Sequence, residues 1–262
     1  MAIAALLGFL QGITEWLPVS SEGVTTAFYS LFFDSSLSEA IAFALWLHVG
    51  TAFSALIALR SEVRVIIRDA ISSPLEPSPM IKYLVIATII SAIVGFPLLL
   101  AVEELSGRVG AVSMGLVGLL MFIPGGLQLR KPKTGERGRQ DISPVDAIIA
   151  GVAQGFAVLP GLSRSGLTVA VLLARQIDRR EALVLSFLMS IPASLGAGIY
   201  ASIDSGILTS GSAVLAAVIA CVVGFVTIRG LLVVAERVNF AAFVIIVGAA
   251  ILLGAIWQGF NS

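Results

Sequence analysis

A stretch of twenty residues that occurs twice sets the strongest constraint on the fold. Residues 8–27 read GFLQGITEWLPVSSEGVTTA, and residues 151–170 read GVAQGFAVLPGLSRSGLTVA. At a constant offset of 143 residues the copies share seven identities in twenty positions, more than small-residue composition readily gives. The chain is therefore expected to contain two related halves. The identical pairs are Gly8/Gly151, Gln11/Gln154, Gly12/Gly155, Ser20/Ser163, Gly23/Gly166, Thr25/Thr168 and Ala27/Ala170.

A break in the middle of the first copy separates two short helices. Pro18 disfavours helical backbone at the residue before it, and Ser20 and Ser21 stand where an N-cap would begin a second helix. Before the break, Gln11 and Glu15 are four residues apart and share one helix face. The pattern predicts helix, break, helix, with an amide, a carboxylate and two hydroxyls at the break.

The composition places both copies in a membrane. Of 262 residues, 58% are hydrophobic and 12% are charged, whereas a soluble domain has roughly 25% charged residues. We therefore expect an all-α polytopic membrane protein. The formal net charge is zero, so nothing indicates binding to nucleic acid, and the single histidine excludes a multi-histidine metal site.

The broken elements are too short to cross the membrane twice. The arms of the first, 1–17 and 21–33, span at most ~25 Å at 1.5 Å per residue, against a hydrocarbon core of ~30 Å. Irregular backbone at membrane depth is tolerated only where it is buried in protein or lines a wet cavity. The sequence therefore predicts two re-entrant helical hairpins, residues 1–33 and residues 145–175.

Three apolar segments of full membrane length follow each hairpin. We expect a first repeat at 1–129, a basic cytoplasmic linker at 130–143 and a second repeat at 144–262. Because three crossings is an odd number, the second half enters from the opposite side, which makes an inverted-topology repeat. The six spans are expected at about 39–59, 83–103, 110–129, 182–202, 213–235 and 240–258.

The basic residues support this topology. If the hairpins do not cross, fourteen of the sixteen Lys and Arg residues lie on one side of the membrane. The positive-inside rule makes that side cytoplasmic. The first hairpin then enters from outside and the second from the cytoplasm, so their tips are expected to meet near the midplane.

Glu15 is the sharpest functional signal, because an ionisable residue inside a membrane segment is expensive and indicates a functional site. The alternatives are a position near the outer surface or a purely structural pair with Arg164. Gln11, one turn earlier, would orient Glu15, bind a substrate oxygen or pack as a helix amide. His48, in the first span, would bond a neighbouring carbonyl or join the site. Glu22 would stabilise a helix N-terminus or assist a metal.

Arg164 occurs only in the second copy and gives that half-site the opposite charge. A guanidinium beside hydroxyls makes a good phosphate clamp, and the helix that begins there favours an anion further. The alternatives are a snorkelling arginine or a bare salt bridge. Ser21 is the candidate nucleophile because it aligns with Arg164, whereas Ser20 is equally well explained as a simple N-cap.

QGITEWLPVSSEG and PGLSRSGLT resemble the two signatures of the undecaprenyl-diphosphatase family, the bacitracin-resistance type of polyprenyl diphosphate phosphatase. The resemblance extends to chain length, span pattern and SFLMSIPAS at 186–194. It implies hydrolysis of an undecaprenyl-type diphosphate to the monophosphate, which recycles the lipid carrier for envelope glycan synthesis. It also implies an active site on the outer face of the plasma membrane and help from a divalent cation, Mg²⁺ or Ca²⁺. The tryptophan in TEWLPVSSEG is more typical of archaeal members.

The resemblance places Glu15, Ser21 and Arg164 in catalytic positions, with Glu15 also a candidate metal ligand. The candidate substrate-binding residues around them are Gln11, Ser20, His48, Gln154, Ser163, Ser165 and Thr168.

Two residues depart from the family pattern. Gln11 stands where the family commonly has the first glutamate of ExxxE, and Val24 stands where a histidine usually follows SSxG. If that histidine is a general acid or base, this chain does without it or recruits His48. The alternative function is a transporter or flippase of polyprenyl phosphate, which inverted repeats and midplane broken helices favour. The sequence leaves open the lipid chain length, a phosphoserine intermediate and a homodimer.

Overall fold

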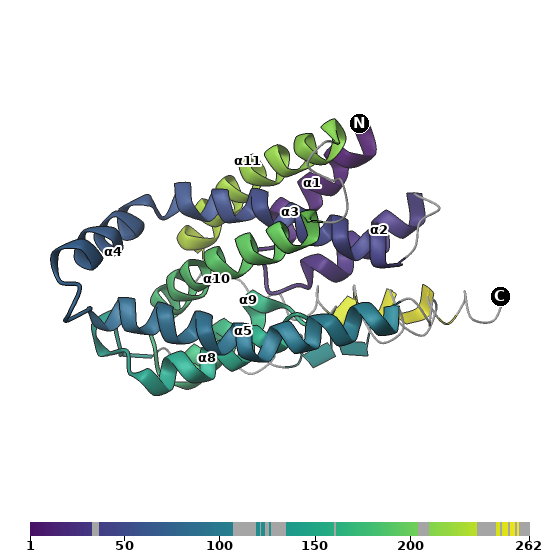
Figure 1. The fold of residues 1–262 in the computed structure, drawn as a ribbon. Coiled ribbons are helices and arrows are strands. Elements are labelled where there is room, and N and C mark those ends of the chain that lie inside the picture. The colour runs from purple at the N-terminus through teal and green to yellow at the C-terminus, as the bar shows by residue number, and fades with distance from the viewer. Residues whose placement is uncertain are drawn as a thin grey trace.

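The computed structural model is an elongated bundle of helices (Figure 1). It describes residues 1–32, 37–106, 135–159, 161–203 and 210–234, with short helical pieces between 119 and 126 and between 245 and 256. Within these ranges every regular element is a helix, and an isolated bridge joins Arg137 to Ile177. The all-α expectation is therefore confirmed for the part of the chain described.

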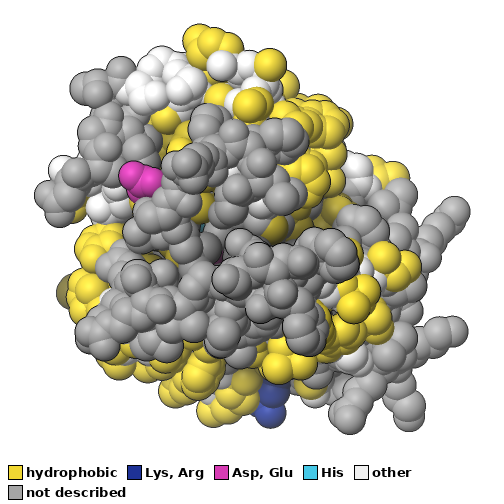
Figure 2. Space-filling model, turned by 90° about the vertical axis from the view of Figure 1, so that its right-hand side faces the viewer, with side chains coloured by type: hydrophobic (Ala, Val, Ile, Leu, Met, Phe, Trp, Pro, Cys, Tyr) yellow, Lys and Arg dark blue, Asp and Glu magenta, His cyan; other side chains and the backbone are white. Residues whose placement is uncertain are grey.

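Four of the described helices are long and apolar enough to cross a membrane. They are α3 (Leu37–Ala58), α5 (Pro79–Ser106), α10 (Arg179–Ser202) and α11 (Gly211–Val234). They agree with four expected spans, although α5 extends beyond 83–103 at both ends. The other two expected spans, 110–129 and 240–258, lie largely outside the described residues. Figure 2 views the bundle end-on, and most of the described side chains visible in it are hydrophobic.

Four shorter helices form the arms of the two broken elements. The first element contains α1 (Ala2–Thr14) and α2 (Ser21–Phe32), and the second contains α8 (Pro144–Phe156) and α9 (Arg164–Ala174). Ser20 Oγ accepts from the Gly23 amide at 3.1 Å, and Ser163 Oγ accepts from the Gly166 amide at 3.1 Å. Matching serine caps therefore begin the second arm of each element. In the second break Gly161 has a φ of 103°, which favours glycine.

Glycines at matching positions let each hairpin pack closely on a span from the other half. Helix α1 packs against α11, and α8 packs against α5. A Cβ added at Gly12 would lie 2.7 Å from Val223 Cβ, and one at Gly155 would lie 2.6 Å from Val94 Cβ. A larger residue at either place would force the helices apart. Small residues are common at helix interfaces in membranes because they allow such close approach. Each hairpin is thus held by a helix far away in the sequence.

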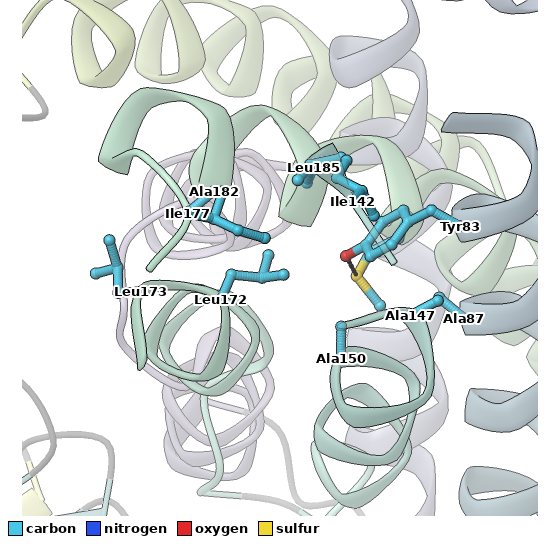
Figure 3. Packing of buried hydrophobic residues seen from close by; sticks show 11 residues of the cluster. Tyr83, Ala87, Ile142, Ala147, Ala150, Leu172, Leu173, Ile177, Ala182 and Leu185 are labelled. Atoms are coloured by element: carbon cyan, nitrogen blue, oxygen red, sulfur yellow. Dashed lines mark hydrogen bonds between the residues drawn. The ribbon is translucent and has the colours of Figure 1, made fainter. Parts of the chain in front are cut away.

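One apolar cluster of the described residues lies between α5, α8, α9 and α10 (Figure 3). Ala147 and Ala150 on α8 face Ala87 on α5, and these small side chains permit close approach of the two helices. Tyr83 is fully buried and donates its hydroxyl hydrogen to Met189 Sδ at 3.2 Å. This cluster fixes the base of the second hairpin against α10.

Two features near the basic linker were not predicted. A thirteen-residue helix, α4 (Arg60–Ser72), connects α3 to α5 and buries none of its residues. Asp146, in the first turn of α8, accepts from Arg137 Nη2 at 2.6 Å and from Arg175 Nε at 2.7 Å. Burial alone would raise the pKa of Asp146, but these hydrogen bonds outweigh it and hold that pKa well below its ordinary value.

Candidate active site

A small pocket lies between the tips of the two broken elements. Its cavity volume is about 30 Å³, far below the roughly 300–1,000 Å³ of pockets that hold a whole small molecule. The pocket therefore suits a small polar group better than a large ligand. Its lining comes from both hairpins and α3: Glu15, Val19, Ser20, Ser21, Glu22, His48, Ala157, Leu162 and Arg164.

The carboxylate of Glu15 is the centre of the hydrogen bonding in this pocket. Glu15 is 4% exposed. Its Oε2 accepts from Gln11 Nε2 at 2.9 Å and from Ser21 Oγ at 2.7 Å, and it lies 3.2 Å from His48 Nε2. Its Oε1 accepts from the guanidinium of Arg164. Four side chains on four different helices therefore hold one buried carboxylate.

Arg164 begins α9 and reaches back to the first hairpin. Its Nη1 donates to the backbone carbonyl of Ser186 on α10 at 3.2 Å, and its guanidinium carbon lies 5.4 Å from the centre of the Trp16 ring. A guanidinium has five N–H donors, and its bonds to Glu15 and Ser186 employ two of them. The pair with Glu15 is formed, and it lies in the pocket wall, where the helix N-terminus also favours an anion.

His48 enters the pocket from α3, and both of its ring nitrogens face oxygen atoms. Nδ1 lies 2.8 Å from the backbone carbonyl of Ala44, so this nitrogen carries a hydrogen. Nε2 faces Glu15, to which only a protonated nitrogen can donate. The two alternatives for His48 are thus both realised, because the ring bonds a neighbouring carbonyl and also reaches the site.

Two serines tie the hairpin tips together. Besides capping α2, Ser20 Oγ accepts from the backbone amide of Gly161 in the other hairpin at 3.0 Å. In return, Ser165 Oγ donates to the backbone carbonyl of Leu17 at 2.7 Å. These bonds join the segment that carries Glu15 to the segment that carries Arg164.

Three further candidates lie outside the pocket lining. Ser163 caps the first turn of α9. Thr168 Oγ1 is 2.6 Å from Ser186 Oγ, which joins α9 to α10. Gln154 Nε2 donates to the carbonyl of Met189 at 3.3 Å, so it packs α8 against α10 instead of facing its counterpart Gln11. The structure places these side chains in the framework that carries Arg164.

Two further residues join the site: Glu22, for which the sequence left a helix N-terminus or a metal as alternatives, and Trp16, which was given no role. Glu22 is 8% exposed and lines the pocket near Glu15, and its position next to Ser21 was its one sequence signal. The ring of Trp16 lies against the guanidinium of Arg164. The sequence gave no hint of this contact, because it depends on how α9 meets the first hairpin.

The donor set does not fit a cation held by protein alone. Among the described residues no group of three or more His, Cys, Asp or Glu side chains is placed to hold a metal ion. Both oxygens of Glu15 already accept from neighbouring side chains.

Comparison with known proteins matches the chain to one family over nearly its whole length. The family described as bacitracin resistance protein BacA matches residues 4–256. The undecaprenyl-diphosphatase of Methanococcoides burtonii is 38% identical over 256 residues, covering 95% of this chain and 96% of the relative. That of Haloarcula marismortui is 37% identical over 261 residues, covering 97% of each. That of Methanopyrus kandleri is 37% identical over 260 residues, covering 95% of this chain and 94% of the relative. The family prediction is confirmed, and this chain belongs to the BacA family of bacitracin resistance proteins.

Proposed function

We propose that this chain is an integral membrane phosphatase that hydrolyses an undecaprenyl-type diphosphate to the monophosphate and inorganic phosphate. The observation that carries the proposal is the buried Glu15 carboxylate, which joins Arg164 and the Ser21 hydroxyl in a pocket between two hairpin tips. The names of the relatives support the same activity and lipid. They give no support to the transport alternative.

The arrangement in the membrane is proposed as two inverted repeats, each with one re-entrant hairpin and three spans. The matching caps at Ser20 and Ser163 and the matching glycine contacts at Gly12 and Gly155 support this arrangement. By the positive-inside rule the basic residues support a cytoplasmic linker, and with it a pocket that opens toward the outer face of the plasma membrane. The diphosphate head would enter the pocket while the isoprenyl tail stays in lipid.

Arg164 and the first turn of α9 are proposed to hold the terminal phosphate. Phosphoryl transfer depends mainly on positioning and on neutralising the charge of the transferred group. A guanidinium at a helix N-terminus supplies both, since it offers several aligned donors together with the positive end of the helix dipole. The incoming phosphate would take over donors near those that now serve Glu15.

Glu15 is proposed as the general base for the Ser21 hydroxyl, whose oxygen is 2.7 Å from Glu15 Oε2. In one route Ser21 Oγ attacks the terminal phosphorus, its proton passes to Glu15, and the lipid monophosphate leaves. Water then hydrolyses the phosphoserine and releases inorganic phosphate. In the other route water attacks directly while Ser21 orients it. Rapid acid quenching followed by detection of phosphoserine separates the two routes.

A divalent cation stays a prediction of the family resemblance. The diphosphate itself carries several oxygen ligands of the kind that Mg²⁺ and Ca²⁺ prefer. Phosphate release measured with Mg²⁺, with Ca²⁺ and with a chelator tests it directly. Equal rates under all three conditions would contradict the prediction.

The central test is phosphate release from undecaprenyl diphosphate by the detergent-purified protein. We expect Arg164→Ala to lower the rate at least about 100-fold, as loss of one charge-stabilising donor does in other enzymes. Arg180→Ala, which removes an exposed arginine at the start of α10, is the matched control and should keep the parent rate. Near-normal release by folded Arg164→Ala protein would reject the proposed function.

A further inference from the structure

Helix α4 exposes apolar side chains on a segment that carries three arginines. None of its thirteen residues is buried. Ile67 is 53% exposed and Ile71 is 76% exposed. Large apolar groups left open in this way, on a helix between two membrane spans, indicate a surface that meets another phase or partner.

The arginines of α4 lie together beside these isoleucines. Arg60, Arg64 and Arg68 are spaced by four residues, so they share one face of the helix, and all three are exposed. At 3.6 residues per turn, Ile67 and Ile71 fall along the edge of the same face. The exposed side of α4 is therefore basic and apolar at once.

The acidic side chains of α4 point the other way. Glu62 and Asp69 line a groove of about 200 Å³ between α4 and the protein body, together with Arg139 from the linker. Ile66 also lines this groove and packs against the core between α3, α10 and α11. The helix is thus anchored by its acidic side, and its arginines project away from the protein.

The position of α4 at the end of the bundle indicates which surface its basic face contacts. Figure 1 shows α4 beyond the adjoining ends of α3 and α5, at the end where α8 also begins. Both flanking helices are of membrane length, so α4 is kept within reach of lipid headgroups. This end of the bundle is rich in arginine, which by the positive-inside rule indicates the cytoplasmic side. The cytoplasmic leaflet carries anionic lipids.

We propose that the face of α4 formed by Arg60, Arg64, Arg68, Ile67 and Ile71 binds the anionic headgroups of the cytoplasmic leaflet. The arginines pair with the headgroup charge, and the isoleucines enter the boundary between headgroups and acyl chains, as in other interfacial amphipathic helices. Because Glu62 and Asp69 face the protein, they do not repel the anionic surface. This inference does not rest on the proposed phosphatase activity.

The test uses the full-length protein in lipid nanodiscs. A Cys221→Ala, Ile71→Cys protein is labelled with a polarity-sensitive fluorophore and placed in discs of phosphatidylcholine alone or phosphatidylcholine mixed with phosphatidylglycerol. We expect blue-shifted emission in the anionic discs, reversed by high salt, which screens surface charge. Each arginine should shift the docking equilibrium about fivefold. A triple variant should therefore lose the response when it combines Arg60→Gln, Arg64→Gln and Arg68→Gln. The triple variant with Lys at the same three positions should keep the response.

The outcomes separate a lipid surface from other partners. Equal emission in neutral and anionic discs would overturn the proposal, and so would an unchanged response in the triple Gln protein. A triple Lys protein that behaves like the triple Gln protein would point to a partner that needs the arginine geometry, and would also overturn it. Glu62→Gln with Asp69→Asn is the matched control and should respond like the parent. Phosphate release by each variant reports separately on the pocket.

Discussion

At the scale of single residues, the environment of Glu15 is unusual because its partners come from so many helices. Gln11 lies on α1, Ser21 on α2, His48 on α3 and Arg164 on α9. An unpaired charge in a buried site is strongly destabilising, by about 3–5 kcal/mol when one partner is removed. Because four side chains share this carboxylate, the loss of one leaves three others in contact with it.

His48 is predicted to act through Glu15. His48→Ala removes a ring nitrogen that lies 3.2 Å from Glu15 Oε2, so we expect the rate of phosphate release to fall about 100-fold. His48→Gln keeps an N–H donor and should recover most of that loss. The measurement is kcat and KM for the two variants. A fall confined to kcat supports positioning of Glu15, whereas an equal loss in both variants would contradict it.

The sequence predicted the residues of the site better than their contacts. Glu15, Ser21 and Arg164 stand out locally, because each interrupts an apolar pattern next to a helix break. His48 is thirty-three residues from Glu15 on another helix, and its reach into the pocket depends on the rotation of α3. Gln154 repeats Gln11 in sequence, yet it bonds α10 instead of a carboxylate, because Val158 stands where the first copy has Glu15.

At the scale of elements, the second hairpin is fixed at its base by Asp146. The carboxylate begins α8 through a capping box with Ser143 and also joins Arg137 of the linker to Arg175 at the end of α9. Both ends of the hairpin are therefore tied to one buried group. The boundaries of α8 and α9 were predictable because serine caps and apolar runs are local signals. The contact of Asp146 with Arg137 and Arg175 was not predictable, because the three residues come from separate segments of the chain.

Asp146→Asn is expected to lower the stability of the protein at neutral pH by about 1–3 kcal/mol, the range for a buried hydrogen-bonding group that loses its partners. Because folding lowers the pKa of Asp146, its contribution is complete above the ordinary value near 4 and is lost as the pH falls toward the folded value. Thermal unfolding of the parent and the variant from pH 7 downward measures how this contribution to stability changes with pH. The parent and the variant should converge at low pH, with Asp69→Asn as control.

Parallel unfolding curves for the parent and Asp146→Asn at every pH would contradict this assignment. The prediction concerns the hairpin base alone, since the pocket lies at the other end of α8 and α9.

At the scale of the whole molecule, each half of the chain builds part of the support for the other. Helix α1 depends on α11, and α8 depends on α5. The apolar lengths predicted four spans that the structure describes, since twenty apolar residues suffice to cross a bilayer. They did not predict α4, because its polar composition carries no span signal, and only apolar segments of membrane length were assigned between the hairpins.

The proposed topology is tested by cysteine labelling in a Cys221→Ala background. Leu75, which is 94% exposed after α4, should react as Leu75→Cys with a membrane-impermeant thiol reagent only from the cytoplasmic side. Ile203, which is 70% exposed after α10, should react as Ile203→Cys only from outside. Labelling of both from one side would reject the inverted repeat.

The bonds between the hairpin tips bear on how the protein can move. A carrier that alternates between two faces must rock one half past the other in each cycle. Here the Ser20 bond to Gly161 and the Ser165 bond to Leu17 join the halves at the point where a carrier would have to part them. Every cycle would break and remake both. A catalyst that receives and releases its ligands at a single face needs no such motion. In such a catalyst these two bonds would keep Glu15 and Arg164 at a constant separation.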